Sequence, residues 1–160
     1  MEKEKIISIL EEVMDPEIPV LSIADLGILR GVEILENEIR VTVTPTYSGC
    51  PAMDTIQEDI RSILLKNGFD KVKINLVLSP AWTSEWMTDS GREKLEAFGI
   101  AAPALNHSCT MAGTGTDEPG HCPLCHSGNI EMISRFGSTA CKALYRCLDC
   151  REPFDYFKCH

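Results

Sequence analysis

Four cysteines near the C-terminus stand in two pairs with the spacing of metal ligands. Cys122 and Cys125 form one Cys-x-x-Cys pair, and Cys147 and Cys150 form another, with 21 residues between the two pairs. A Cys-x-x-Cys turn directs two thiolates toward one ion, and two such turns complete a tetrahedral shell of four sulfur ligands. The pattern predicts a structural zinc ion, with iron in the same shell as the alternative.

Three further residues of the cysteine-rich tail have no place in that shell, namely Cys141, Cys159 and His160. They could form a second metal site, or the two cysteines could be ordinary buried or exposed thiols, and the sequence leaves both interpretations open. His107 and Cys109 lie in a small, polar, turn-rich tract and are interpreted as incidental rather than as ligands.

A lone cysteine, Cys50, lies between Gly49 and Pro51, where an alternating apolar run gives way to a helical pattern. Gly49 permits a sharp turn, and Pro51 suits the first position of a helix because its missing N–H would have no partner there. The positive end of the helix dipole should then favour the thiolate of Cys50 over the thiol. The prediction is a nucleophile or a metal ligand, and the alternative is a small cysteine that fills a gap in the core.

The elements that must position Cys50 follow from hydrophobic periodicity. Residues 2–14 have the apolar spacing of an amphipathic helix, and a second helical pattern runs from Met53 to a stop signal at Lys66-Asn67-Gly68. Alternating or apolar-rich runs predict strands over residues 28–35, 38–44 and 72–78. The order helix, strand, strand, helix, strand predicts an α+β fold in which a small mixed sheet has helices packed on one face.

Composition divides the chain into three parts. Residues 1–100 hold the α/β pattern, residues 101–120 have the composition of a linker, and residues 121–160 carry the paired cysteines. The last part is interpreted as a zinc ribbon that depends on its metal for folding, because about 40 residues make too small a core. Trp82 and Trp86 stand four residues apart and are interpreted as a hydrophobic cover for the first domain.

Charge and cysteine usage exclude several classes of function. The formal net charge is −9, so the chain offers little of the basic surface that nucleic-acid binding needs. The N-terminus lacks the pattern of an export signal, and no apolar run approaches the about 20 residues that span a bilayer. We therefore expect a cytoplasmic protein without membrane association, whose cysteines are metal ligands or thiols rather than disulfides.

Several of these residues stand in motifs that resemble a known family. The motifs are Asp15-Pro16-Glu17-Ile18-Pro19, Asp25-Leu26-Gly27, Gly49-Cys50-Pro51 and Pro80-Ala81-Trp82-Thr83. They resemble those of the metal–sulfur cluster assembly factors of the SufT type. The tail, with Phe136-Gly137-Ser138-Thr139-Ala140-Cys141-Lys142 and the run from Cys147 to Phe154, is similar to that of the D components encoded with phenylacetyl-CoA (ring 1,2-) epoxidase.

The resemblance implies an assembly-factor domain with a zinc ribbon, which supplies or matures an iron–sulfur or other iron centre of the epoxidase in aerobic phenylacetate degradation. It implies as partners the diiron oxygenase and the flavin and [2Fe–2S] reductase of that complex. The family's cysteine corresponds to Cys50, and the aspartate of its Asp-Pro-Glu motif corresponds to Asp15. The expected role is that of an accessory factor rather than an enzyme.

The leading hypothesis is a carrier that holds iron or a cluster transiently through Cys50 while the ribbon docks a client. One thiolate cannot complete a cluster's ligand set, so a homodimer is the simplest source of further ligands, with a client or a small thiol as alternatives. Asp15 could be an oxygen ligand or a proton acceptor, or it could only cap a turn. Thr44, Thr46 and Ser48 could hydrogen-bond thiolate or sulfide, or could be ordinary strand-end and turn residues.

Two other classes of function compete with the carrier. In the first, Cys50 would be the covalent nucleophile of an acyl-transfer enzyme, but residues 1–105 contain no histidine to act as its general base. In the second, the chain would be a structural adaptor whose ribbon docks other proteins and whose Cys50 is inert. An acyl adduct trapped on Cys50 would favour the enzyme. Equal client activity in a Cys50 variant, with client binding lost when the ribbon is removed, would favour the adaptor.

Overall fold

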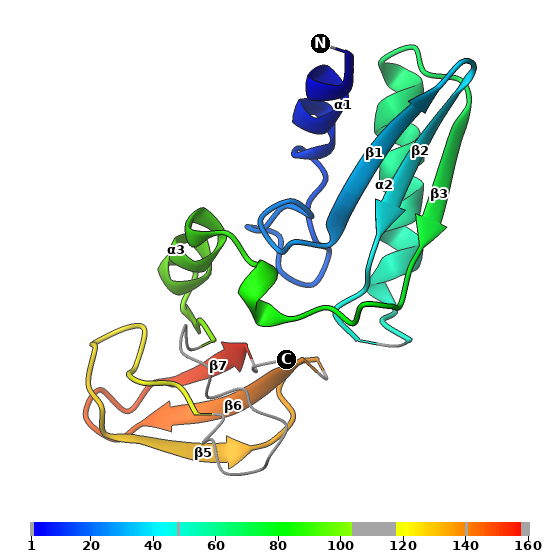
Figure 1. The fold of residues 1–160 in the computed structure, drawn as a ribbon. Helices are drawn as coiled ribbons and strands as arrows, with labels where there is room; N and C mark the ends of the chain where they lie inside the picture. Colours follow the sequence, from blue (N-terminus) through cyan, green and yellow to red (C-terminus); the bar gives the residue numbers. More distant parts are fainter. Residues whose placement is uncertain (1, 48, 104–117, 140, 158–160) are drawn as a thin grey trace. The chain divides into compact units, whose positions relative to one another are not determined.

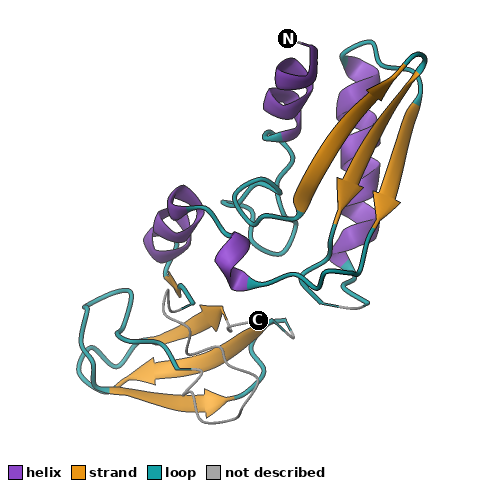
Figure 2. Cartoon of the chain, in the orientation of Figure 1, coloured by secondary structure: helices purple, strands orange, loops and turns teal. Residues whose placement is uncertain are grey.

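A computed structural model of the chain describes residues 2–47, 49–103, 118–139 and 141–157 (Figures 1 and 2). The contacts between residues divide the chain into two compact units, Met1–Gly91 and Arg92–His160. Each unit has its own sheet. Within the described residues, no helix is both long enough and apolar enough to cross a membrane.

The first unit is a three-stranded mixed sheet with helices on one face, as the sequence predicts (Figure 1). The sheet order is β1-β2-β3, with β1 antiparallel to β2 and β2 parallel to β3. Helix α2 makes the crossover between the two parallel strands, and α1 packs against α2 and β1. The elements are α1 (Glu2–Leu10), β1 (Leu29–Leu35), β2 (Glu38–Val43), α2 (Ala52–Lys66), β3 (Val72–Leu76) and the short 3-10 helix η1 (Ser84–Trp86).

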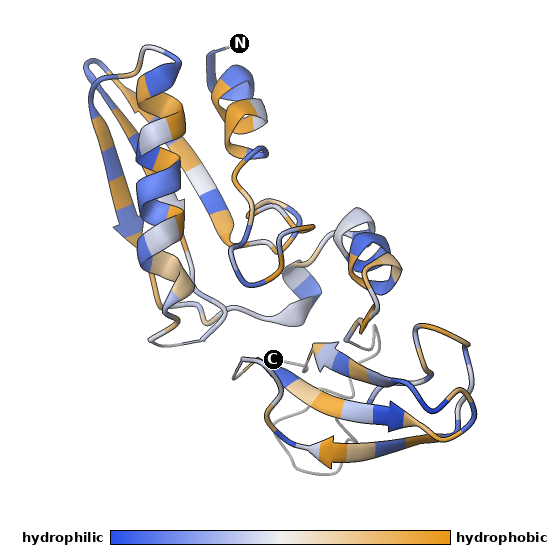
Figure 3. Ribbon diagram, turned by 180° about the vertical axis from the view of Figure 1, so that it is seen from behind, coloured by the Kyte–Doolittle hydropathy of each residue, from blue (hydrophilic) through white to orange (hydrophobic). Residues whose placement is uncertain are grey.

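In helix α2, the apolar residues that repeat with helical spacing in the sequence form the face that packs against the core. Its polar and apolar residues alternate around the axis (Figure 3), and the apolar ones face the core. The helix ends as predicted, because the Asn67 N–H still bonds the carbonyls of Ile63 and Leu64, while Gly68 turns away with φ +90°. The buried face consists of Ala52, Met53, Ile56, Ile60 and Leu64.

The irregular segment between α1 and β1 also contributes to this core. Ile18, Leu21, Ile23, Leu26 and Ile28 are almost completely buried. A backbone bond from Asp15 N–H to the Leu21 carbonyl and one from Ile23 N–H to the Val13 carbonyl hold the segment in shape. The segment therefore fixes the position of Asp15 against the body of the domain.

The second unit is a four-stranded sheet of order β4-β7-β6-β5, in which β4 is parallel to β7 and the other pairs are antiparallel. Its core consists of Ala101, Cys122, Ala143, Tyr145, Cys147, Phe154 and Tyr156. The division at Gly91 lies earlier than the predicted boundary at residue 100, and Ile100 and Ala101 pair with the ribbon sheet as β4. The elements are α3 (Asp89–Ala97), β4 (Ile100–Ala101), β5 (Ile130–Ser134), β6 (Lys142–Cys147) and β7 (Pro153–Phe157).

Candidate functional site

The paired cysteines of the second unit meet at one point. Their four sulfur atoms all lie within 4.8 Å of one another. Cys125 Sγ is 3.5 Å from Cys147 Sγ, and Cys122 Sγ is 3.9 Å from Cys150 Sγ. Zinc–sulfur bonds of about 2.3 Å in a tetrahedron place the sulfurs about 3.8 Å apart, so the group fits a structural zinc ion.

In each Cys-x-x-Cys pair, which we call a knuckle, a backbone N–H donates to the sulfur of the first cysteine. The Leu124 N–H donates to Cys122 Sγ at 3.4 Å, and the Cys150 N–H donates to Cys147 Sγ at the same distance. Among these neighbouring thiols, the pKa of Cys147 is lowered to about 7, mainly by the backbone N–H of Cys150, whereas the pKa values of Cys125 and Cys150 are raised. Directed N–H groups of this kind favour the thiolate that a metal ligand must be.

Each knuckle is followed by a residue in the left-handed backbone region. His126 has φ 63° and Arg151 has φ 65°. The chain reverses at these positions so that the Cys122 N–H reaches the Ser127 carbonyl and the Cys147 N–H reaches the Glu152 carbonyl. Asp149 ties the knuckles together by accepting hydrogen bonds from the side chains of Ser127 and Asn129.

Of the other candidate ligands of the tail, Cys141 alone lies within the described residues, and it is not part of this group. Cys141 is buried, and its sulfur lies 3.0 Å from the Thr139 hydroxyl. Cys159, His160, His107 and Cys109 lie outside the described residues. A second metal site involving Cys141, Cys159 and His160 stays a prediction.

Cys50 lies at the entrance to α2 in the first unit. The chain leaves β2 at Val43, turns at Gly49 with φ +80°, and enters the helix through Pro51, which occupies the N-cap position. The Cys50 carbonyl accepts the Met53 N–H at 3.2 Å, and the Cys50 N–H donates to the Tyr47 carbonyl at 3.3 Å. Cys50 therefore stands next to the N-cap, as predicted, with its side chain half-buried.

The surroundings of Cys50 do not favour the thiolate. Burial raises the pKa of the thiol, and the negative charges of Glu17 and Asp15 raise it further. The Ala52 amide and the Thr46 hydroxyl oppose this shift without reversing it. The prediction of a thiolate activated by the helix dipole is wrong in this structure, because desolvation and two nearby carboxylates outweigh the dipole.

Asp15 belongs both to a turn and to the Cys50 site. One oxygen, Oδ1, accepts the N–H groups of Glu17 at 2.7 Å and of Ile18 at 3.0 Å, which is the turn-capping role. The same carboxyl group acts electrostatically on Cys50. The Glu17 carboxylate also acts electrostatically on Cys50. Glu17 was not among the candidate site residues predicted from the sequence, although it stands in the same Asp-Pro-Glu motif.

The hydroxyl residues between β2 and Cys50 are placed unequally. Thr46 is buried and interacts with the Cys50 thiol. Thr44 is also buried, and its N–H continues the hydrogen bonding of β2 by donating to the Ile28 carbonyl at 2.9 Å. Ser48 lies outside the described residues.

The Asp25-Leu26-Gly27 motif has a structural role, together with the two tryptophans. The Trp82 indole N–H donates to the Leu26 carbonyl at 2.8 Å, and the Thr88 hydroxyl lies 3.3 Å from Asp25 Oδ1. Gly27, with φ +74°, has no room for a side chain because the Trp86 backbone lies against it. We call these two interlocked segments, residues 22–28 and 82–91, the tryptophan latch.

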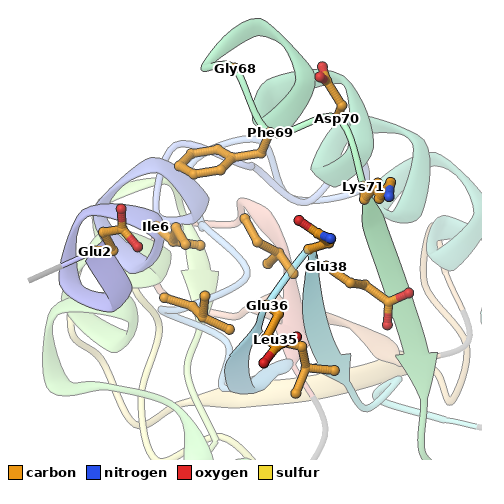
Figure 4. A pocket seen from close by; sticks show the side chains of 12 residues that line it. Glu2, Ile6, Leu35, Glu36, Glu38, Gly68, Phe69, Asp70 and Lys71 are labelled. Carbon is orange, nitrogen blue, oxygen red and sulfur yellow. The ribbon is translucent and has the colours of Figure 1, made fainter.

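An acidic groove of about 310 Å³ opens at the other end of the first sheet, around the turn between β1 and β2 (Figure 4). Its apolar lining includes Ile6, Leu35 and Phe69. None of its lining residues belongs to the Cys50 site, which follows the opposite end of β2. Its charged residues are Glu2, Glu36, Glu38, Asp70 and Lys71.

Comparison with known proteins identifies both parts of the chain. Residues 3–81 match the family model of an iron-sulfur cluster assembly protein, and residues 106–158 match that of the PaaD zinc beta ribbon domain. Among solved structures, a domain of unknown function (DUF59) from Bacillus anthracis has a TM-score of 0.54 and 31% identity. The match covers 58% of this chain and 90% of that one.

Curated relatives extend the match to nearly the whole chain. The putative D component of 1,2-phenylacetyl-CoA epoxidase from Escherichia coli is 50% identical over 152 residues, which cover 95% of this chain and 90% of the relative. An Fe-S protein maturation auxiliary factor of Porphyromonas gingivalis is 37% identical over 95 residues, covering 58% of this chain and 90% of that protein. The chain therefore belongs to the PaaD family, in which an iron-sulfur cluster assembly domain is followed by a zinc ribbon.

Proposed function

We propose that this chain matures an iron or iron–sulfur centre of phenylacetyl-CoA epoxidase in aerobic phenylacetate degradation. It would hold the metal species transiently at Cys50 and dock its client through the zinc ribbon. The observation that carries the proposal is the position of the half-buried Cys50 at the entrance to α2, beside the Thr46 hydroxyl, in a domain whose family model is that of an iron-sulfur cluster assembly protein. The names of the relatives, an epoxidase component and Fe-S maturation auxiliary factors, support it.

The chemistry of the Cys50 site suits a transient cargo. The site offers one sulfur and, nearby, two carboxylates, whose negative charge attracts a metal cation. A cluster needs four ligands, so the others come from a second protomer, the client or a small thiol. An incomplete ligand set holds a cluster weakly enough to release it, in contrast to the closed shell of four cysteines in the ribbon.

The experiment compares the metal content of the wild type with that of Cys50→Ser after anaerobic purification and reconstitution with iron and sulfide. We expect the wild type to hold iron and acid-labile sulfide that the variant loses, while both keep about one zinc per chain. Cys141→Ser is the matched control, since Cys141 is also a cysteine outside the four-sulfur group, and a loss of iron in this variant alone would assign the iron to the predicted second site instead of Cys50. It should keep its iron, and equal iron in Cys50→Ser and the wild type would contradict the proposal.

A transfer assay carries the test to the client. The loaded protein is mixed with the apo form of the [2Fe–2S] reductase component or with the iron-free oxygenase, and recovery of client activity is followed. Wild-type protein should restore activity, and Cys50→Ser should not. Full activation by Cys50→Ser would exclude Cys50 as the carrier ligand.

The second candidate function is a structural adaptor, because the Escherichia coli relative is named as a component of the epoxidase itself. An adaptor would remain in the complex at fixed stoichiometry, whereas a maturation factor acts on many clients in turn. Quantitative mass spectrometry of the purified epoxidase separates the two functions. A stoichiometric D component, together with normal client activity in Cys50→Ser cells, would favour the adaptor.

A further inference from the structure

The acidic groove at the turn between β1 and β2 combines buried and exposed apolar side chains. Ile6 and Ile39 are 1% and 5% exposed, and the ring of the half-buried Phe69 extends toward α1 (Figure 4). Ile34 and Leu35 also line the groove and are each 42% exposed. Exposed apolar side chains that continue into a buried apolar lining are typical of a surface that binds another molecule.

Three segments that are distant in the sequence form the acidic groove. They are the first turns of α1, the turn between β1 and β2, and residues 68–71 between α2 and β3. The Ile39 N–H donates to the Lys71 carbonyl at 2.9 Å, which joins the second segment to the third. Helix α1 packs against both α2 and β1. The groove is therefore a product of the fold of the first unit and not of one loop.

The charge of the groove indicates what it would bind. Its charged residues are four carboxylates and one lysine, a formal charge of −3. Among the described residues, Glu38 is the only one of these carboxylates with an ion-pair partner, the Arg40 guanidinium at 3.7 Å. An apolar lining surrounded by carboxylates is complementary to an apolar side chain with cationic neighbours.

Charge also separates the possible occupants. A second copy of the chain carries a net charge of −9 and would be repelled by the groove. Residues 104–117, which lie outside the described residues, contain no lysine or arginine that could meet the carboxylates. Nucleic acids and anionic lipid surfaces have the wrong sign of charge. A cationic segment of another protein has the right one.

We propose that the acidic groove docks a short segment of a partner protein in which a large apolar side chain stands between lysine or arginine residues. The apolar side chain would pack against Ile6, Ile39 and Phe69. Its cationic neighbours would meet the carboxylates of Glu36 and Asp70, which are exposed.

The groove and the Cys50 site lie at opposite ends of β2. The six residues of this strand, Glu38–Val43, span roughly 17 Å. A segment bound in the groove therefore leaves the Cys50 thiol free to meet a metal species. The proposal does not rest on the proposed function, because none of the groove's lining residues belongs to the Cys50 site.

The first test measures the binding of a dye-labelled probe peptide, Ser-Lys-Arg-Leu-Lys-Arg-Ser, to the zinc-loaded full chain by fluorescence anisotropy at physiological ionic strength. One control peptide has serine in place of leucine and keeps the charge. The other has glutamate in place of the four cationic residues. Both controls should bind at least tenfold more weakly than the probe, because each lacks one half of the recognition.

Variants of the chain test whether the groove is the binding surface. Glu36→Lys combined with Asp70→Lys should raise the dissociation constant of the probe about tenfold or more, because attraction becomes repulsion. Leu35→Ser, which changes no charge, should raise it several-fold. The matched control combines Glu11→Lys with Glu58→Lys, at exposed positions outside the groove, and should change it little. Circular dichroism confirms that each variant folds.

A photo-cross-link locates the probe on the chain. A benzophenone amino acid replaces the leucine of the peptide, and mass spectrometry maps the residues that it labels after irradiation. The labels should fall within residues 34–39 or 68–71, the two exposed segments that line the groove. Labels confined to any other part of the chain would place the peptide elsewhere and contradict the proposal.

Four further outcomes would overturn it. The probe does not bind at millimolar concentration. The serine peptide binds as tightly as the probe, so the apolar lining is not used. The control pair Glu11→Lys and Glu58→Lys weakens binding as much as the groove pair, so the attraction is that of the whole acidic unit. The wild-type chain self-associates in sedimentation equilibrium and Leu35→Ser does not, so a second copy occupies the groove.

This proposal and the proposed function fail separately. Cys50→Ser should bind the probe with the affinity of the wild type, whatever its iron content. The groove pair Glu36→Lys and Asp70→Lys should keep the iron and sulfide of the wild type after reconstitution, because Cys50 is unchanged. Loss of iron in Cys50→Ser therefore tests the carrier, and loss of probe binding in the groove pair tests the docking surface.

Discussion

At the scale of single residues, the reactivity of the Cys50 thiol should depend on the negative charges of Asp15 and Glu17. Asp15→Asn removes one negative charge but keeps the oxygen that accepts the N–H groups of Glu17 and Ile18. Because that charge raises the pKa of the Cys50 thiol, its removal should lower the pKa and increase the thiolate fraction at any pH below it. The rate of Cys50 alkylation, mapped by mass spectrometry against pH, should therefore reach its midpoint at a lower pH.

Two controls accompany this experiment. Glu17→Gln should shift the midpoint in the same direction, since Glu17 also raises the pKa of Cys50. Glu36→Gln, at the turn between β1 and β2, removes a charge from the far end of the sheet and should have no effect. An unchanged profile in Asp15→Asn would mean that Asp15 and Cys50 do not form one site.

The residues that follow the two knuckles give a second prediction. His126 and Arg151 have positive φ, a backbone region that costs an L-residue roughly 1–2 kcal/mol and a β-branched residue more. Valine at either position should therefore weaken zinc binding about tenfold or more, because folding and binding are coupled. Glycine should bind zinc at least as tightly as the wild type, and competition with a chromophoric chelator measures both.

The four-cysteine group and the Cys50 site differ in how far the sequence predicts them. The four-cysteine group was predictable because the spacing of each knuckle is local and allows little freedom in where its thiolates point. The electrostatics of Cys50 were not, since Asp15 and Glu17 are distant along the chain and reach the thiol only through the fold. A local argument from the helix dipole therefore gave the wrong direction for the pKa.

At the scale of elements, the tryptophan latch depends on one glycine. In Gly27→Ala the new Cβ would lie 2.7 Å from the Trp86 Cβ and closer still to its carbonyl oxygen, on a backbone with φ +74°. The steric clash with Trp86 and the backbone strain together should lower the free energy of unfolding of the first unit by about 3 kcal/mol. Urea unfolding, followed by hydrogen exchange in peptides of α2, measures the loss.

Gly68 is the matched control for this variant. It also has a positive φ, +90°, but an added Cβ would have no atom within 4 Å. Gly68→Ala should therefore show only the backbone strain, about 1 kcal/mol. If Gly27→Ala and Gly68→Ala lowered the free energy of unfolding equally, the contact with Trp86 would not matter for stability.

The regular elements of the first unit could be predicted because their apolar residues repeat with the period of a helix or a strand. The latch could not, since its bonds join residues far apart in the sequence, such as Leu26 and Trp82. The segment that carries Ile18, Leu21 and Ile23 into the core has no such period either. The interpretation of the tryptophans as a core cover identified Trp82, which is 4% exposed, but not the partner segment that it contacts.

At the scale of the whole molecule, the two units differ in what holds them together. The first has a core drawn from two helices, the strands β1 and β2, and the segment before β1. The second has a small core in which two metal ligands, Cys122 and Cys147, are themselves core residues. We therefore expect its folding free energy to depend on a bound metal.

Removal of zinc should consequently unfold one unit and spare the other. With a strong chelator, amides of β5, β6 and β7 should lose their protection from hydrogen exchange, while those of β1, β2 and α2 keep it. Structural zinc sites contribute about 10–16 kcal/mol in small domains, so the effect should be complete rather than partial. A ribbon that stays protected without metal would contradict the dependence on zinc, and general unfolding would contradict the independence of the first unit.

The latch also gives the molecule a built-in optical signal. Trp82 and Trp86 are the only tryptophans of the chain, and both belong to the latch, one with its N–H bonded to a carbonyl and one beneath the guanidinium of Arg30. Selectively excited indole emission therefore comes from this one loop pair. The emission maximum should shift to longer wavelengths when the latch opens to water. It should stay constant when the ribbon loses its metal, because the aromatic core residues of the ribbon, Tyr145 and Tyr156, are tyrosines.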